Sequence, residues 1–169
     1  NLLGLVLGTT TVIFLLVAPF GGVIADKYGR ARMVGITDFL AGAVLLIQAW
    51  YFAMGDVPVA VLLLVNGAYG VFWGVFWPAF SGIIPAVVPS EGLQKGNALN
   101  QLLTNSGLII GAACAGILID QYGAAVTLTI DAVSFMISGV MIYSFRHLTP
   151  RAVHSENTVL ADLRHGWKV

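Results

Sequence analysis

Five long apolar runs, separated by short polar stretches, dominate the pattern of this chain. They cover about residues 1–25, 33–54, 58–84, 96–119 and 123–146, and only Asp38 and Asp131 place a charge well inside a run. A helix needs about 20 apolar residues to cross about 30 Å of hydrocarbon. The runs are also far too long for the strands of a membrane barrel. The pattern therefore predicts five transmembrane helices in an all-α, polytopic bundle.

Composition supports a membrane environment and narrows the function classes. Hydrophobic residues make up 58% of the 169 positions and charged residues only 9%, whereas soluble domains carry about 25% charged residues. The net charge is zero, so we expect no nucleic acid as a partner. Cys114 is the single cysteine, and we find no metal-ligand spacing, nucleophile–base pair or phosphate-binding glycine loop. We therefore expect no enzyme activity, no cofactor and no metal site.

Basic residues predict how the helices are oriented. All eight lysines and arginines fall in the loops after the first and third runs or behind the fifth: Lys27, Arg30, Arg32, Lys95, Arg146, Arg151, Arg164 and Lys168. By the positive-inside rule this side is cytoplasmic, which places the amino end outside the plasma membrane. An outside amino end without a signal peptide leads us to expect a preceding helix. The polar residues 147–169 are predicted to be a cytoplasmic linker toward a second half of the protein.

The first basic loop, residues 22–32, has a defined local chemistry. Gly22 would let the backbone approach a neighbouring helix, and Gly29 would permit a positive φ in the turn. Asp26, at a helix end, has three possible partners: Lys27, Arg30 or the N-terminus of a neighbouring helix.

This loop resembles the G-x-x-x-D-[RK]-x-G-R-x-[RK] segment between the second and third helices of the major facilitator superfamily. The matching residues are Gly22, Asp26, Lys27, Gly29, Arg30 and Arg32. Residues 74–101 resemble the fourth helix and following loop of bacterial members related to macrolide and siderophore exporters, and residues 131–135 resemble their sixth helix. The resemblance implies a fragment covering helices two to six of twelve. It also implies that the basic loop acts as a conformational latch.

The fourth run departs from the exporter pattern G-x-x-x-G-P-x-x-G-G. Gly107, Gly111 and Gly116 match it, but Ala112 and Ala115 replace a proline and a glycine. The three glycines are candidates for close helix packing, because small residues let helices approach in lipid.

Two sets of residues are candidates for contact with a substrate or coupling ion. In the third run Asn66, Tyr69, Trp73 and Phe76 share a helical face that Trp77 borders. This face is either the wall of a cavity for amphipathic or cationic compounds or a surface toward lipid. Asp38 and Asp131 are coupling candidates because carboxylates inside spans are costly. Asp131 is expected closer to the midplane, whereas Asp38 is near enough to the basic loop to pair with it; the alternative for each is a structural hydrogen bond.

Two functions are consistent with these features. The first is a secondary active transporter that exports small amphipathic molecules by alternating access. Its partners would be the small-molecule substrate, the lipid bilayer and the missing carboxy-terminal half of the same chain. The alternative is a non-transporting membrane sensor or assembly protein on the same scaffold.

Overall fold

The computed structural model describes residues 2–149, and every regular element in that range is helical. The predicted linker beyond Thr149, with its arginines and histidines, lies outside the described residues. The elements are α1 (Leu2–Tyr28), α2 (Arg30–Met54), α3 (Val59–Ser81), α4 (Ile83–Val87), the 3-10 turn η1 (Ser90–Gly92), α5 (Leu93–Ser144) and the 3-10 turn η2 (Arg146–Leu148). This is the all-α bundle that the apolar runs predict.

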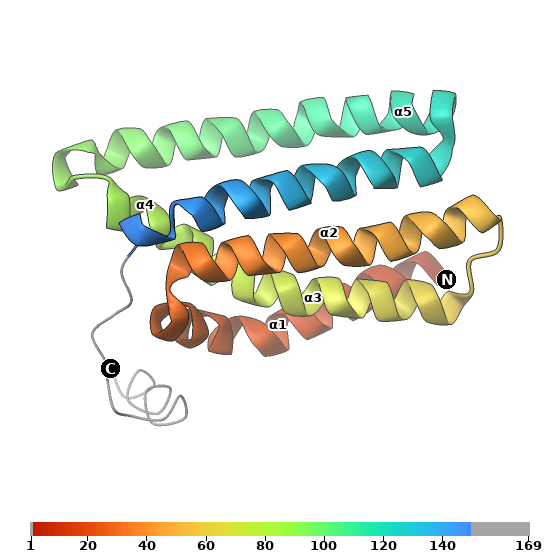
Figure 1. Ribbon diagram of the computed structural model, residues 1–169, viewed down its shortest axis with the longest axis horizontal. Helices are drawn as coiled ribbons and strands as arrows, with labels where there is room; N and C mark the ends of the chain where they lie inside the picture. Colours follow the sequence, from red (N-terminus) through yellow and green to blue (C-terminus); the bar gives the residue numbers. More distant parts are fainter. Residues whose placement is uncertain (1, 150–169) are drawn as a thin grey trace.

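Helix α5 consists of two arms that meet at Gly123. Gly123 has φ 81° and ψ 167° inside the otherwise helical element, a conformation that glycine adopts without a Cβ penalty. Figure 1 shows the arm before Gly123 and the arm after it running in opposite directions. The fourth and fifth apolar runs lie in these two arms.

The third apolar run is also divided. Helix α3 ends at Ser81, Gly82 follows, and the short α4 continues to Val87. Pro85 lies inside α4, while Pro78 lies inside α3. Within residues 2–149, four helical stretches are long and apolar enough to cross a membrane, with α3 and α4 counted as one and both arms of α5 as another. The chain is therefore an integral membrane protein with several candidate spans.

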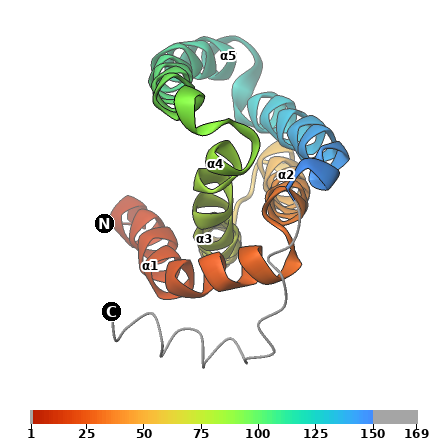
Figure 2. The same ribbon diagram turned by 90° about the vertical axis from the view of Figure 1, so that its left-hand side faces the viewer.

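The helices pack in a defined order around α2 and α3. The main interfaces join α2 to α5, α1 to α3, and α2 to α3. Viewed along the bundle, α1 lies beside α3, α2 lies between α3 and the second arm of α5, and the first arm of α5 lies farther out (Figure 2). The junctions α1–α2 and α3–α5 and the carboxyl end of α5 gather at one end of the bundle (Figure 1). The described lysines and arginines all belong to that end.

Small residues fill the interior, and large apolar side chains point outward. The fully buried apolar positions include Ala25, Val34 and Ala79. Leucines and isoleucines on every long helix are exposed, Leu108 and Ile109 on the first arm of α5 among them. In lipid such side chains need no burial, because the solvent is as apolar as they are.

Glycines allow the tightest helix contacts. A Cβ built on Gly35 would lie 2.9 Å from the carbonyl oxygen of Gly139, and one on Gly139 would lie 2.8 Å from that of Gly35. On the other side of the bundle, a Cβ on Gly21 would overlap the carbonyl oxygen of Gly74. The backbones of α2 and α5, and of α1 and α3, therefore touch at these points.

The glycines selected from the sequence differ from these. Gly22, expected to allow a close approach, would carry a Cβ in ordinary contact, 3.8 Å from Pro78. Its neighbour Gly21 makes the close approach instead, because the helical turn directs that position toward α3. A Cβ on Gly107, Gly111 or Gly116 would meet nothing within 4 Å in the described part of the chain. Their packing role stays a prediction about a partner beyond residues 2–149.

The adjacent glycines 21 and 22 provide a matched test of this packing. Alanine at either position gains about 1 kcal/mol of helix propensity over glycine. At Gly21 the added methyl must also push α3 away, and overpacking of this kind costs about 1–3 kcal/mol. Gly21→Ala should therefore lower the thermal unfolding midpoint of the detergent-solubilised protein relative to Gly22→Ala. Equal midpoints for the two variants would show that the α1–α3 contact is looser than described.

Candidate functional site

The loop between α1 and α2 closes on an ion pair. A guanidinium nitrogen of Arg30 (Nη2) lies 2.8 Å from Asp26 Oδ1, and Arg30 Nε donates a hydrogen bond of 2.9 Å to the same oxygen. Gly29 has a φ of 96°, the positive value expected for the turn. Of the possible partners of Asp26, the structure selects Arg30, while the Lys27 ammonium lies 5.7 Å from the ring centroid of Tyr28.

Gly82, between α3 and α4, forms the surface on which Arg30 rests. A Cβ at Gly82 would overlap the Arg30 guanidinium, so a side chain of any kind would displace it. The ion pair lines a cavity of about 310 Å³ together with Gly82 and Pro85. The basic loop is thus held against the junction of α3 and α4.

Thr149 joins the same assembly from the far end of the described chain. Its hydroxyl oxygen accepts a hydrogen bond of 3.2 Å from the backbone N–H of Ala31, and the residue is 4% exposed. This N–H belongs to the first turn of α2, which Gly29 leaves without a side-chain cap. We call the group Asp26, Arg30, Gly82 and Thr149 the clasp. Gly82 and Thr149 were not among the residues predicted from the sequence. Thr149 lies 118 positions from Ala31 and carries no local signal.

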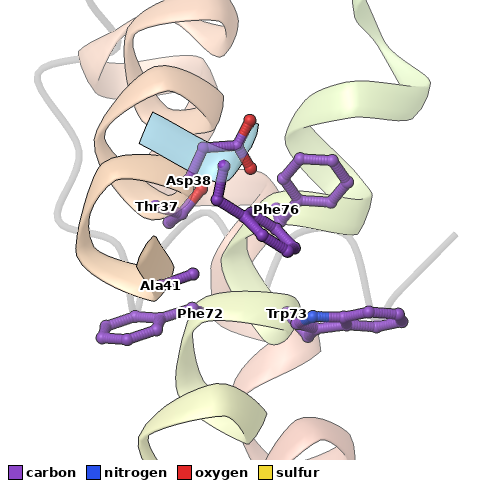
Figure 3. Close-up of a pocket in the computed structure, with 7 residues that line it drawn as sticks. Thr37, Asp38, Ala41, Phe72, Trp73 and Phe76 are labelled. Atoms are coloured by element: carbon purple, nitrogen blue, oxygen red, sulfur yellow. The ribbon is translucent and has the colours of Figure 1, made fainter. Parts of the chain in front are cut away.

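A second site lies in the middle of the bundle, where three helices meet (Figure 3). It is a cavity of about 110 Å³ between α2, α3 and the second arm of α5. Its lining comprises Thr37, Asp38, Ala41, Phe72, Trp73, Phe76 and Phe135. We call it the aromatic pocket. Asp38 supplies its one carboxylate, and Figure 3 shows that carboxylate directed from α2 toward the ring of Phe76 on α3.

Asp38 forms a hydrogen bond rather than an ion pair. It is 3% exposed, and its Oδ2 accepts a hydrogen bond of 2.7 Å from the hydroxyl of Ser138 on α5. The pairing with the basic loop that the sequence allowed is not formed, because the side chain points across the bundle toward α5. Thr37 beside it donates to the carbonyl oxygens of Met33 and Val34 in its own helix.

Asp131 differs from Asp38 in its surroundings. It is exposed among the described residues, and it does not line the aromatic pocket. Its backbone carbonyl accepts a hydrogen bond of 2.7 Å from Ser134. Depth along the helix favoured Asp131 as a coupling residue, but the structure directs Asp38 into the pocket.

The polar and aromatic side chains on this face of α3 contact three different parts of the bundle: α1, the second arm of α5 and the aromatic pocket. Asn66 turns toward α1, where its side-chain oxygen accepts a hydrogen bond of 3.3 Å from Thr10. Tyr69 packs edge-on against Phe135, with ring centroids 6.3 Å apart. Trp73 and Phe76 line the pocket, and Trp77 packs edge-on against both, at 5.8 and 6.0 Å.

No group of three or more histidine, cysteine, aspartate or glutamate side chains comes together in residues 2–149. The chemistry of the two sites is therefore that of charge pairing, hydrogen bonding and aromatic contact.

Long apolar helices, close glycine contacts and an aromatic pocket with one carboxylate inside the bundle define a polytopic α-helical membrane protein. The whole chain, residues 1–169, matches the Major Facilitator Superfamily, and the protein belongs to that family. Its members are transporters and not enzymes. The resemblance found in the loop from Gly22 to Arg32 is thereby confirmed for the family.

Several characterised and uncharacterised transporters are similar to this chain. An uncharacterised MFS-type transporter of Bacillus subtilis, YkuC, is 28% identical over 81% of the chain and 30% of its own length. The staphyloferrin A transporter of Staphylococcus aureus is 27% identical over 80% of the chain and 34% of its own length. Macrolide efflux protein A of Enterococcus faecalis is 27% identical over 98% of the chain and 53% of its own length. The chain thus spans about a third to a half of these relatives, and no solved structure matches it.

The hydrogen bond from Thr149 can be tested by removing only its hydroxyl. Thr149→Val keeps the shape but leaves the buried N–H of Ala31 unpaired, which costs about 1 kcal/mol for a lost cap. Backbone amide exchange over residues 30–34 should then become about fivefold faster. Thr149→Ser retains the oxygen and should exchange like the parent protein. Identical exchange in the valine and serine variants would contradict the contact.

Proposed function

We propose that this protein is a secondary active transporter that exports small amphipathic molecules by alternating access. The observation that carries the proposal is the match of the entire chain to a transporter family. Export is supported by the similarity to a macrolide efflux protein, and amphipathic substrates by a pocket whose wall is aromatic except for Thr37, Asp38 and Ala41.

The bundle sits in the plasma membrane with its basic end in the cytoplasm. The described lysines and arginines at that end support this orientation, because basic loops are retained inside. Residues 1–146 then provide five spans, about 1–25, 33–54, 58–84, 96–119 and 123–146. Residues 147–169 lead to a carboxy-terminal half that completes the transport path. Gly107 and Gly111, one helical turn apart and without a close neighbour among residues 2–149, face that half.

The clasp acts as the latch of the cytoplasmic side. The Asp26–Arg30 pair is partly exposed, at 49% and 35% of the side chains, so its own contribution to stability is small, up to about 1 kcal/mol. A weak contact of this kind suits a latch, because it forms and breaks at low cost during each cycle. Lys27 and Arg32 add positive charge to the same loop and keep it in the cytoplasm.

The latch role is tested by neutralising Asp26 in the full-length protein. Asp26→Asn removes the charge that holds Arg30 while changing few atoms, so export of a fluorescent amphipathic dye should fall, by up to about fivefold for a contact worth about 1 kcal/mol. Membrane insertion, followed by the amount of folded protein in the membrane fraction, should stay near the parent level. This combination separates a conformational defect from a folding defect.

Asp56→Asn serves as the matched control. It removes a carboxylate from the turn at the opposite end of the bundle, between α2 and α3, and should leave export unchanged. Undiminished export by Asp26→Asn, or equal loss in both variants, would remove the support for a latch at the clasp.

A further inference from the structure

Asp38 has an unusual set of neighbours for a carboxylate inside a membrane bundle. Such groups usually pair with a cation or line a functional cavity. Among residues 2–149 the one ion pair joins Asp26 and Arg30, and every described lysine and arginine lies near the basic end of the bundle. Asp38 therefore has no positively charged partner within the described protein.

One oxygen of this carboxylate faces the pocket. Oδ2 is occupied by the hydroxyl of Ser138 at 2.7 Å. No hydrogen bond reaches Oδ1 from the described residues, yet no side-chain oxygen or nitrogen in that range is both fully buried and unpaired. Oδ1 must then retain contact with open space, and the space next to Asp38 is the aromatic pocket.

The rest of the pocket favours positive charge. Phe72, Trp73, Phe76 and Phe135 present aromatic rings around the carboxylate, and the negative faces of such rings attract cations, with tryptophan the strongest. Thr37, the other polar residue of the lining, already donates its hydroxyl to its own helix. The pocket thus offers one carboxylate and several aromatic ring faces. Both repel an anion, and a neutral group gains less from them than a cation does.

The dimensions indicate how much of a ligand fits. A cavity of about 110 Å³ accommodates one compact head group and not a whole drug-sized molecule, for which sites of about 300–1,000 Å³ are usual. Trp73 is 41% and Trp77 39% exposed, so an apolar tail leaving the pocket would run over aromatic surface. A small cation on an apolar body meets both requirements.

We propose that the aromatic pocket binds the ammonium head group of amphipathic cations, with Asp38 as counter-ion and Phe72, Trp73, Phe76 and Phe135 as the enclosing rings. This proposal deepens the proposed function and rests on it for its role in export. Binding itself is measurable without transport. Ser138 is a positioning residue, because its hydrogen bond fixes the carboxylate with Oδ1 toward the pocket.

The test compares two ligands of nearly the same shape on the full-length protein in detergent. Phenyltrimethylammonium carries the charge, and tert-butylbenzene replaces its nitrogen by carbon. Titration followed by tryptophan fluorescence should show the cation bound about tenfold or more tightly than the neutral compound, as expected for a desolvated cation held by aromatic rings and a carboxylate. Asp38→Asn should strongly reduce this preference, with the part due to the aromatic rings remaining, while the affinity for tert-butylbenzene stays near the parent value.

Matched variants keep the result specific. Asp120→Asn, which removes a carboxylate far from the pocket near the turn at Gly123, should retain the full preference. Phe76→Leu should weaken cation binding by about threefold to tenfold, while Phe39→Leu, next to Asp38 but outside the lining, should not. The phenylalanine pair decides the question even if Asp38→Asn fails to fold. Equal affinity for the two ligands in the parent protein, or an unchanged preference in Asp38→Asn, would overturn the proposal.

Flux measurements in proteoliposomes distinguish cation binding in the aromatic pocket from the proposed transporter function. Charge-selective binding without any flux would leave the pocket assignment standing and remove the transporter function. Flux of phenyltrimethylammonium that is insensitive to Asp38→Asn would leave the transporter function standing and remove the pocket assignment.

Discussion

The close approach of α2 and the second arm of α5 is the contact on which the interior of this bundle depends. Lipid surrounds the apolar faces of these helices, so the hydrophobic effect gives little reason for them to associate. Gly35 and Gly139 face each other with no side chain between their backbones, and a Cβ on Gly42 would lie 2.7 Å from the carbonyl oxygen of Ala132. Dispersion contacts over such a short separation provide the association that burial provides in water.

That separation also determines the chemistry of the pocket. Asp38 lies between Gly35 and Gly42 on α2, and Ser138 lies next to Gly139 on α5. The two side chains meet at 2.7 Å because the glycines bring the backbones together. A wider spacing would leave the carboxylate without a donor inside the membrane, where an unpaired polar group is costly. The same spacing leaves room for the rings of α3 to close the remaining side.

The clasp at the basic end follows a different logic. Its members come from four segments: the last turn of α1, the start of α2, the junction of α3 with α4, and the residue after η2. Its ion pair is partly solvated and worth little alone. Gly82 contributes to the clasp by having no side chain, because the Arg30 guanidinium occupies the space that a Cβ would fill. The bundle therefore combines a tightly packed interior with a basic end held by separable contacts, the combination that the proposed rocking transport would require.

The sequence by itself determined the helical class, the long apolar spans, the family, and the turn at Gly29, because these depend on local composition and on a short motif. It did not show that Gly21, and not Gly22, makes the close contact with α3. Nor did it show that the polar and aromatic side chains of α3 face different neighbours, or that Thr149 accepts a hydrogen bond from the first turn of α2. It also favoured Asp131, whose depth along a helix was readable, over Asp38. Those features depend on which face of each helix meets which neighbour, and in a uniformly apolar span the hydrophobic pattern does not record that choice. Only the tertiary packing, through the rotation of each helix at its glycine contacts, decided that Asp38 points into an aromatic pocket and that Arg30 rests on Gly82.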